Sequence, residues 1–405
     1  MALPVPSPQS PVPRTLRVLM LAPTPYFADR GCHVRIFEEA RAVTEQGAQV
    51  RIVTYHLGRD LPGIPTDRIV SVPWYRKLAA GPSWHKPYLD ILLFFKALAV
   101  GRRFRPDLIH AHLHEGAFLG IFLKWFLRVP LLFDCQGSLT GEIVDHGFVR
   151  KGSLLARLFG ALERFINDRA DVIITSSGPG ARELAENWGV APERVFPLTD
   201  GVNTDEFRPL DREEARRRLQ LPHDRPVVAF LGVMNRYQGV DLLLEVVKIL
   251  KERGVAAHFL LMGFPDDRYR KLAGDLGVAD LITFTGRIDY REAPFYLSAA
   301  DVAVSPKISL TEANGKLFNY LACGLPTLVF DTPINREILD DAALYARYGE
   351  VSDFADQLEK LLTDPQLRAD LAHQGRERAI TEHSWQKRGC QLVAAYRRLL
   401  AEEIS

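Results

Sequence analysis

Short apolar runs alternate with helical stretches along the N-terminal part of the chain. Residues 16–22 (LRVLMLA) form the first apolar run, a helical stretch covers residues 34–46, and residues 49–54 (QVRIVT) form the next run. Apolar runs of this length are typical of strands buried in a parallel sheet. The order strand, loop, helix, strand therefore predicts the building block of a doubly wound α/β fold.

This pattern recurs in two series, which are separated by a stretch rich in turn formers at residues 197–209. The first series continues with predicted strands at 107–111, 131–134 and 171–175. The second series has predicted strands at 227–232, 257–262, 281–284, 301–304 and 327–330, with helices at 240–253 and 317–323. Residues 357–403 are helical by pattern, apart from a turn near Asp364 and Pro365. We expect a linker at 197–209 and one α/β domain on each side of it.

The predicted organisation is two Rossmann-like doubly wound domains that face each other across a cleft. The Pro-rich segment 1–14 is expected to lack regular structure. The two domains are expected at 15–200 and 201–382, followed by a C-terminal helix at 383–405 that packs back on the first domain. A chain of 405 residues suits two such domains. Ligands of doubly wound domains bind at the carboxyl ends of the strands, which here face the cleft.

Composition narrows the class of protein. Lys and Arg number 51 against 50 Asp and Glu, so nothing in the overall charge indicates a nucleic-acid partner. No apolar run is long enough to span a membrane, and no signal-peptide pattern is seen. The four cysteines form no C-x-x-C pair, which argues against structural zinc and a disulfide framework. The expected location is the cytoplasm.

The strongest candidate for binding chemistry is the segment 312–326 (EANGKLFNYLACGLP). Asn314 and Gly315 end a loop, and Lys316 begins a helix, where unpaired N–H groups and a positive side chain suit a phosphate. Asn319 follows three residues later and lies on the same helix face. The alternative is a plain loop–helix junction with a solvated lysine.

A second candidate is the turn 232–239 (GVMNRYQG), between a predicted strand and a helix. Its glycines let the backbone approach a phosphate closely, and Arg236 is placed to reach it. The pattern matches neither the dinucleotide fingerprint nor the P-loop, so an ordinary strand–helix turn remains the alternative.

Three candidates lie in the first domain. Alternation along a strand puts His110, His112 and His114 on one side, either as contacts for a sugar or phosphate or as core histidines. A metal site is disfavoured because no further ligand is evident. Gly31 allows close backbone approach in the loop 27–33. The loop 134–138, with Gln136, Gly137 and Ser138, is expected on the acceptor side.

Two stretches of the first domain mix apolar residues with Lys and Arg, at 88–105 and 118–128. Such stretches are either packed helices or peripheral contacts with a membrane surface, as a lipid-linked acceptor would require.

Several ordered motifs together resemble family 4 glycosyltransferases of the GT-B fold. Residues 105–112 (RPDLIHAH) resemble the family's R-P-D-[IV]-[IV]-H-x-H segment, and residues 200–207 (DGVNTDEF) resemble the stretch that opens its second domain. Residues 238–245 (QGVDLLLE), 284–288 (FTGRI) and 320–326 (YLACGLP) are similar to its later helix, base-binding loop and A-C-G-x-P motifs. The resemblance runs from about residue 16 to the C-terminal region.

The chain departs from the family pattern at its usual phosphate cations and glutamates. Val233 and Gln238 stand where Arg and Lys are usual, and residues 316–324 look like the subgroup with a K-x-F-x-Y-[LM]-A-x-G helix. Lys316, with Arg236, is expected to supply the charge instead. The family usually has two glutamates in an E-x7-E motif. Asn319 takes the place of the second, which binds ribose, and Thr311 or Glu312 takes the place of the first.

The resemblance implies a retaining, metal-independent hexosyltransferase that uses a nucleotide-sugar donor and a hydroxyl acceptor: a glycan, a lipid-linked molecule or a small molecule. No cofactor is implied. Catalytic roles fall on His112, Glu312 and Lys316. Donor contacts are expected from Gly31, Gly232, Asn235, Arg236, Gln238, Gly286, Arg287, Ile288, Asn314, Gly315, Lys316, Leu317 and Asn319. The alternatives are a non-catalytic nucleotide-sugar-binding protein of the same fold and a sugar-nucleotide epimerase.

Overall fold

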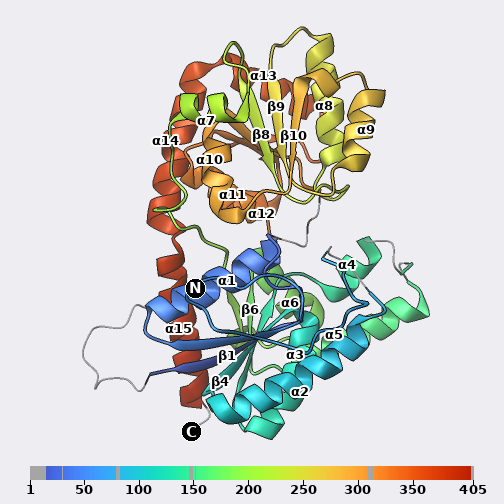
Figure 1. The fold of residues 1–405 in the computed structure, drawn as a ribbon, viewed down its shortest axis with the longest axis vertical. Coiled ribbons are helices and arrows are strands. Elements are labelled where there is room, and N and C mark those ends of the chain that lie inside the picture. Colours follow the sequence, from blue (N-terminus) through green and yellow to red (C-terminus); the bar gives the residue numbers. More distant parts are fainter. Residues whose placement is uncertain are drawn as a thin grey trace.

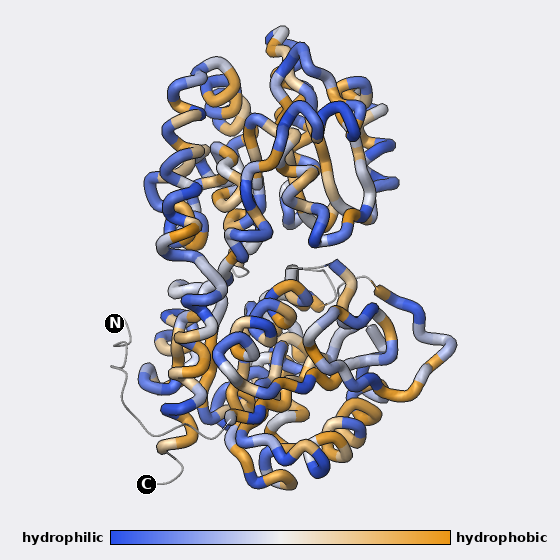
Figure 2. The backbone as a smooth tube through the Cα atoms, turned by 60° about the vertical axis from the view of Figure 1, so that its left-hand side comes forward, coloured by the Kyte–Doolittle hydropathy of each residue, from blue (hydrophilic) through white to orange (hydrophobic). Residues whose placement is uncertain are grey.

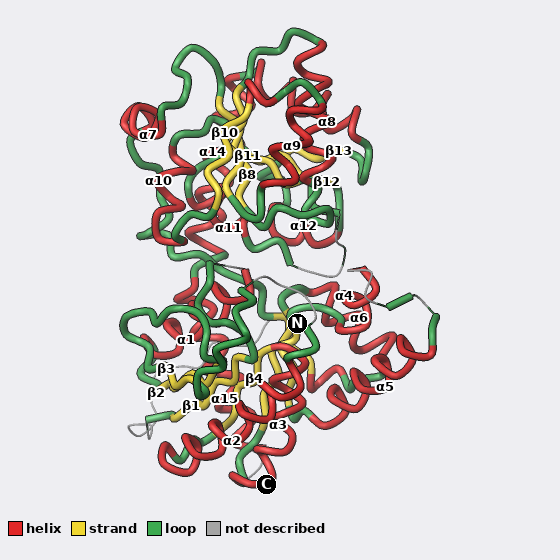
Figure 3. The backbone as a smooth tube through the Cα atoms, turned by 45° about the vertical axis from the view of Figure 1, so that its right-hand side comes forward, coloured by secondary structure: helices red, strands yellow, loops and turns green. Residues whose placement is uncertain are grey.

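The computed structural model describes residues 15–29, 31–78, 83–145, 149–150, 152–308, 310 and 313–402. Figure 1 shows two lobes, one above the other, and Figure 3 shows that the strands of each lobe are enclosed by helices. Each lobe holds one sheet in which all neighbouring strands pair in parallel. The prediction of two doubly wound α/β domains is confirmed.

The first domain has a seven-stranded sheet in the order β3-β2-β1-β4-β5-β6-β7. Every residue of the two central strands β4 and β5 is buried, which explains their uninterrupted apolar character. The strands are β1 (Arg17–Ala22), β2 (Gln49–Thr54), β3 (Thr66–Arg68), β4 (Leu108–His112), β5 (Leu131–Cys135), β6 (Val172–Thr175) and β7 (Val195–Pro197). The helices are α1 (Gly31–Glu45), α2 (Lys86–Phe104), α3 (Leu113–Leu127), α4 (Leu139–Asp145), α5 (Leu154–Arg169) and α6 (Gly178–Trp188).

The second domain has a six-stranded sheet in the order β10-β9-β8-β11-β12-β13. Its strands are β8 (Val227–Leu231), β9 (His258–Met262), β10 (Ile282–Gly286), β11 (Val302–Ser305), β12 (Thr327–Phe330) and β13 (Leu344–Ala346). The helices that follow β7 are α7 (Arg212–Leu219), α8 (Val240–Glu252), α9 (Asp267–Asp275), α10 (Ala293–Ser298), α11 (Lys316–Ala322), α12 (Pro333–Leu339), α13 (Val351–Thr363), α14 (Pro365–Glu382) and α15 (Trp385–Glu402). Short 3-10 turns occupy Pro192–Arg194, Ala279–Leu281 and Tyr290–Glu292.

In each sheet the strand order reverses once, between β1 and β4 in the first domain and between β8 and β11 in the second. Helices leave the sheet toward opposite faces on the two sides of such a point, so a crevice opens at the carboxyl ends of the strands. The loop that follows β1, the start of α3 directly after β4, and the loops that follow β8 and β11 line one common cavity. The fold therefore directs both crevices toward a shared site.

The C-terminal helices connect the two lobes along one side (Figure 1). Helix α14 packs on α11 of the second domain, and α15 packs on α1 of the first. The α1–α15 contact is close, because a Cβ atom at Gly389 would lie 2.8 Å from the carbonyl oxygen of Ala42. The chain passes between the domains near Val202 and again near Ser384, and these two residues form a parallel β-bridge.

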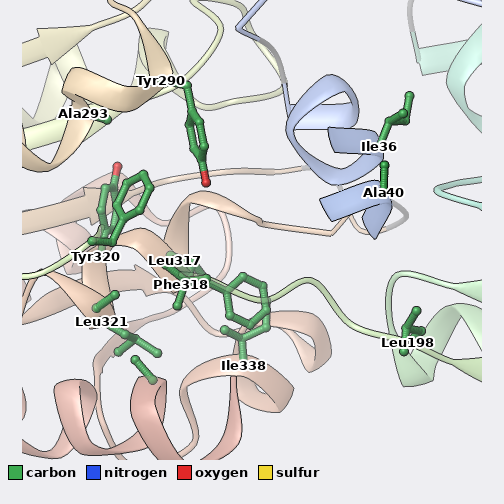
Figure 4. Packing of buried hydrophobic residues seen from close by; sticks show 14 of the residues in the cluster. Ile36, Ala40, Leu198, Tyr290, Ala293, Leu317, Phe318, Tyr320, Leu321 and Ile338 are labelled. Atoms are coloured by element: carbon green, nitrogen blue, oxygen red, sulfur yellow. The ribbon is translucent and has the colours of Figure 1, made fainter. Parts of the chain in front are cut away.

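Tyr290 of the second domain contacts the first domain beside α1 (Figure 4). Its hydroxyl donates a hydrogen bond to Oε1 of Glu38 over 3.3 Å, and its ring lies 6.4 Å from that of Phe27 in the first domain. Burial raises the pKa of Glu38 to about 7, against the opposing effect of Arg41. The two domains thus meet through packed aromatic rings and a buried carboxyl group beside the cavity.

Candidate functional site

A cavity of about 800 Å³ lies between the two domains. Its lining comes from the loops after β1 and β5 and the start of α3 on one side, and from the loops after β8, β9, β10 and β11 on the other. This volume is in the range of about 300–1,000 Å³ that is typical of ligand sites. Both domains therefore supply side chains to one candidate site.

Three glycines stand at the carboxyl ends of adjacent strands of the second domain. Gly232 donates a backbone hydrogen bond to Met262, and Gly263 donates one to Gly286. A Cβ atom at Gly263 would lie 1.7 Å from the carbonyl oxygen of Gly232, which no side chain tolerates. The strand ends therefore approach so closely that they leave a floor of bare backbone.

Lys316, the first residue of α11, projects over this floor. Its ammonium group donates a hydrogen bond to Oε1 of Gln238 and lies 4.6 Å from the centre of the Phe230 ring. A Cβ atom at Gly232 would come within 3.0 Å of Nζ. This hydrogen bond joins the turn after β8 to the start of α11, 78 residues apart in sequence. It fixes the positive charge of Lys316 at the cavity wall.

The loop before α11 is held by a buried polar network. Nδ2 of Asn314 donates to Ser305 over 3.1 Å and to Oδ1 of Asn335 over 3.0 Å. Gly315 lies beside Asp200, since a Cβ atom there would be 3.0 Å from Oδ2 of that residue. Asn314, Gly315 and Asn319 line the cavity. Leu317 is not part of the described lining, because its side chain is fully buried in the core, and its expected donor contact remains a prediction.

Lys307 is a cavity residue that the sequence analysis missed. Its side chain is 4% exposed, lines the cavity and donates a hydrogen bond to the carbonyl oxygen of Ala313 over 2.7 Å. The available signal was its position two residues after β11, at a strand end that faces the cleft. A buried lysine here adds a second positive group to the same wall as Lys316.

Arg236 is not among the described residues that line the cavity, and its side chain is exposed. Oδ1 of Asn235 accepts a hydrogen bond from the backbone N–H of Gln238 over 3.0 Å. This turn directs Arg236 outward and uses Asn235 as a local cap, while Tyr237 and Gln238 face the cavity. Neither Asn235 nor Arg236 is part of the described lining, and their expected contacts with the donor remain a prediction.

The loop after β10 contributes Arg287 and Ile288 to the lining, whereas Gly286 lies behind them. The guanidinium of Arg287 pairs with Asp29 of the first domain, at 2.8 Å between Nη2 and Oδ2. This ion pair joins the two domains across the mouth of the cavity. Gly31 also lines the cavity, at the start of α1. Thr311 and Glu312 lie outside the described residues.

Arg35 of α1 is the centre of a buried charge network that the sequence analysis did not identify. Its Nη2 lies 2.8 Å from Oδ1 of Asp134 and 2.9 Å from Oε1 of Glu39, and its Nη1 lies 2.7 Å from Oδ1 of Asp200. Its guanidinium also donates to the carbonyl oxygen of Leu198 over 3.0 Å. Arg35 thereby ties α1, β5 and the interdomain passage together at the cavity wall.

These contacts set the charge states of the network. Burial raises the pKa of Asp134, but Arg35 and His112 outweigh it and hold the pKa below its ordinary value. Burial raises the pKa of Glu39 well above its ordinary value, although Arg35 opposes it. At neutral pH, Asp134 is therefore ionised.

The three histidines do not share one side, which corrects that expectation. Strand β4 ends at His112, and Leu113 takes a left-handed φ of 62°, so the alternation stops there. The rings of His110 and His112 stack 4.3 Å apart, while the ring of His114 packs on that of Phe133. Burial lowers the pKa values of all three histidines, so they are neutral near pH 7.

His112 is fully buried and lies outside the described lining. Its Nδ1 donates to Oδ2 of Asp134 over 3.0 Å. His110 Nδ1 is hydrogen bonded to the hydroxyl of Tyr396 on α15 over 2.7 Å. In this arrangement His112 is held by Asp134 behind the cavity wall, and the sugar contact expected for it remains a prediction.

Glu39, His110, His112 and Asp134 form a group that offers metal-ligand atoms within 4.8 Å of one another. Arg35 lies inside this group, because its guanidinium bonds both oxygens of Asp134 and one oxygen of Glu39. A metal ion would have to displace or repel that fixed positive charge. The group is therefore better described as a salt-bridge network than as a metal centre.

On the acceptor side, Gln136 and Gly137 line the cavity as expected, but Ser138 is not part of the described lining. Ser138 instead donates a hydrogen bond over 3.3 Å to Glu163, whose carboxylate also accepts from the backbone and hydroxyl of Thr140. Glu163 holds the start of α4 in this way, so Ser138 is occupied by local structure.

Solved structures share this architecture over nearly the whole chain. A sucrose-phosphate synthase from Thermosynechococcus elongatus superposes with a TM-score of 0.79 at 21% identity, covering 96% of this chain and all of that one. HepE from Anabaena, in complex with UDP and glucose, gives 0.75 at 15% identity, with 95% and 100% covered. WaaG, a glycosyltransferase involved in lipopolysaccharide biosynthesis, gives 0.73 at 18%, with 93% and 99% covered.

Curated relatives align over most of the sequence. The D-inositol 3-phosphate glycosyltransferase of Acidothermus cellulolyticus is 28% identical over 397 residues, which cover 92% of this chain and 86% of the relative. That of Geodermatophilus obscurus is 27% identical over 416 residues, covering 96% and 90%. The model of the glycosyl transferase 4-like domain matches residues 30–201, and the model of glycosyl transferases group 1 matches residues 211–378.

Two facing Rossmann-like domains with a site between them define the GT-B fold, which confirms the predicted fold class. The two family models follow one another along the chain and leave only its ends and a short linker unmatched. The chain belongs to glycosyltransferase family 4.

Proposed function

We propose that this glycosyltransferase moves a hexosyl unit from a nucleotide-sugar to a hydroxyl acceptor, with retention of anomeric configuration and without a metal ion. The observation that carries the proposal is Lys316, held by Gln238 over the bare backbone of Gly232 at the cavity wall. A diphosphate carries about two negative charges and needs cationic and N–H donors. The second domain offers such donors, so we assign the donor to it and the acceptor to the first domain.

The charge distribution supports a metal-free donor site. Lys316 and Lys307 both line the second-domain wall, and Arg35 faces them from the first domain. Positive side chains fixed at the leaving phosphate stabilise the negative charge that develops as the glycosidic bond breaks. They do the work that a divalent cation performs in other sites. HepE, whose fold is similar, is described in complexes with UDP and with UDP-glucose.

In the proposed reaction, the bond from the anomeric carbon to the phosphate oxygen breaks, and the bond to the acceptor oxygen forms on the same face of the sugar. The acceptor proton passes to the leaving phosphate oxygen. Of the described carboxylates that line the cavity, Asp29, Glu115 and Asp200 each pair with a cation. Asp90 accepts a hydrogen bond from Tyr55 on the acceptor side. This pairing favours the phosphate itself as the base.

The test is nucleotide release from a panel of UDP-, GDP-, ADP- and dTDP-sugars, measured with and without EDTA. We expect binding of one nucleotide class, slow donor hydrolysis without acceptor and no loss of activity with EDTA. An α-linked donor should give an α-linked product by NMR of the anomeric proton. Absence of binding to every donor would contradict transfer, and inhibition by EDTA would contradict metal independence. Nucleotide binding without any turnover would favour a non-catalytic role.

We also propose that the first domain touches a membrane surface through α2 and α3. Both helices carry hydrophobic stretches (Figure 2) and expose large apolar side chains, with Phe95 62% and Trp125 75% exposed. Exposed arginines, Arg102 and Arg103, end α2. Aromatic residues beside basic ones suit an interface with anionic lipids. In the described part of the chain, no helix is long and apolar enough to cross a membrane.

Sedimentation with phosphatidylcholine vesicles, with and without phosphatidylglycerol, tests the membrane contact. We expect binding to the anionic vesicles, and a loss of at least about 5-fold in the double variant Phe95→Ser/Trp125→Ser, because each ring contributes buried apolar area. Ile380→Ser on α14 is the matched control, since its side chain is half exposed but belongs to the second domain. Equal binding of the double variant and this control would refute the contact.

A further inference from the structure

The acceptor side of the cavity continues into an apolar groove between α2, α3, α4 and α5. These helices pack side by side in the first domain (Figure 3). We call the acceptor groove the part of the cavity lined by six apolar side chains: Ile91, Phe118, Leu139, Ile143, Phe159 and Leu162. No member of this set offers a hydrogen bond through its side chain. The groove is therefore unsuited to sugar hydroxyls or phosphates along its length.

Polar side chains from α2, α3 and the loop after β5 line the same cavity as the acceptor groove. Lys86 and Glu115 form an ion pair at the cavity wall, and Gln136 donates to Asp134 over 2.7 Å. Asp90 lies there as well, and burial raises its pKa to about 7. The first-domain side of the cavity thus combines polar side chains with the apolar side chains of the acceptor groove.

The groove is continuous with apolar side chains that reach solvent. The ring of Phe118 lies 5.2 Å from that of Phe122 and 6.5 Å from that of Phe165, which joins α3 to α5. Ile91, at the rim, is 57% exposed, and Leu158 of α5 is 65% exposed. Soluble proteins rarely leave such a continuous apolar surface open without a ligand or partner for it.

We propose that the acceptor groove holds the hydrocarbon chain of the acceptor, so that the acceptor is a long-chain amphiphile rather than a free sugar. Its hydroxyl-bearing head lies among the polar side chains of the cavity, and its chain runs outward between α2 and α5. This inference rests on the proposed function, and it names the acceptor class. Burial of methylene groups against the six apolar side chains supplies the binding free energy that a bare sugar head would lack.

The experiment uses two fluorescent acids that share a dansyl head: dansyl-aminoundecanoic acid and dansyl-aminobutyric acid. Equilibrium titration of the full chain compares their affinities. We expect the longer acid to bind at least about 30-fold more tightly, because each additional buried methylene favours binding. Equal affinity of the two acids would overturn the inference.

Variants locate the bound chain. The double variant Phe159→Ser/Leu162→Ser should weaken the longer acid at least about 10-fold, since it removes two walls of the groove. Ile91→Asp provides a second variant, in which an exposed rim residue introduces a charge with little risk to folding. Ile380→Ser is the matched control, because Ile380 is half exposed on α14 and does not line the cavity. Unchanged affinity for the longer acid in both groove variants, or an equal loss of affinity in the control, would place the bound hydrocarbon chain outside the groove.

Nucleotide titration of the same preparations separates this inference from the proposed function. Donor-side residues such as Lys316 belong to the other domain, so nucleotide affinity should stay within about 2-fold in the groove variants and report correct folding. Normal nucleotide binding with no chain-length preference would reject the amphiphilic acceptor alone. Binding of the longer acid without any nucleotide binding would reject the proposed transfer reaction.

Discussion

Replacing Lys316 by alanine is expected to lower turnover at least ~100-fold, which corresponds to about 2.7 kcal/mol of transition-state stabilisation. The ammonium group is held by Gln238 and the Phe230 ring at the end of β8, so its position is fixed before the donor binds. Charge that is fixed in advance stabilises a leaving phosphate without reorganisation during the reaction. Steady-state nucleotide release gives kcat and KM for wild type and variant.

A matched control separates the role of Lys316 from a general loss of positive charge. Lys360→Ala removes an exposed lysine on α13 of the same domain and should leave kcat unchanged. Lys316→Met keeps much of the packing over Phe230 and should behave like the alanine variant if charge is what matters. Near-normal kcat in either Lys316 variant would show that Lys316 does not stabilise the leaving phosphate. Lys307 would then be the next lysine to replace.

Arg35→Met is expected to be the most destabilising single change in the first domain. It leaves the buried carboxyl groups of Asp134 and Glu39, and that of Asp200, without their shared cation. Removing one partner from a buried ion pair costs about 3–5 kcal/mol. We expect the calorimetric melting temperature of the first domain to fall by roughly 10 °C. Transfer activity should fall as well, since Arg35 lines the cavity.

A double variant tests whether the unpaired charge is the cause. Arg35→Met/Asp134→Leu removes the carboxylate with the lowered pKa and should recover part of the lost stability, although not the activity. Arg51→Met is the control, because Arg51 is 41% exposed and pairs with Asp67 at the surface, where ion pairs contribute little. A melting temperature unchanged in Arg35→Met would show that the network does not stabilise the fold.

The fold was largely predictable because buried parallel strands are uninterrupted apolar runs. Residues 327–330 were predicted as a strand, and β12 spans the same four residues. Strands β3, β7 and β13 were missed, since each has only three residues and no distinct apolar run. The long C-terminal helical pattern correctly contained a turn at Asp364, whose carboxylate accepts a hydrogen bond from the backbone of Leu367. The second break in the helical pattern, between α14 and α15 near Ser384, was not predicted, because neither glycine nor proline marks it.

The candidate site was predictable only where it is local in sequence. Lys316 and Asn319 share one short helix and were expected to share one site, and the structure puts both in the cavity wall. Arg236 was expected at the donor, but its side chain is exposed and outside the described lining, in a turn where Asn235 accepts a hydrogen bond from Gln238. Arg35 was missed because its partners lie 99 and 165 residues away, and no periodicity reveals such a pairing.

The C-terminal helix has a consequence for the order in which the protein is made. Helix α15 completes the first domain, with Gly389 against α1 and Tyr396 bonded to His110 behind the cavity. During synthesis the ribosome delivers the whole second domain before this helix emerges. The face of α1 that α15 covers must therefore remain exposed, and available to chaperones, until α15 has emerged. The first domain thus reaches its native state only after the second domain has been synthesised.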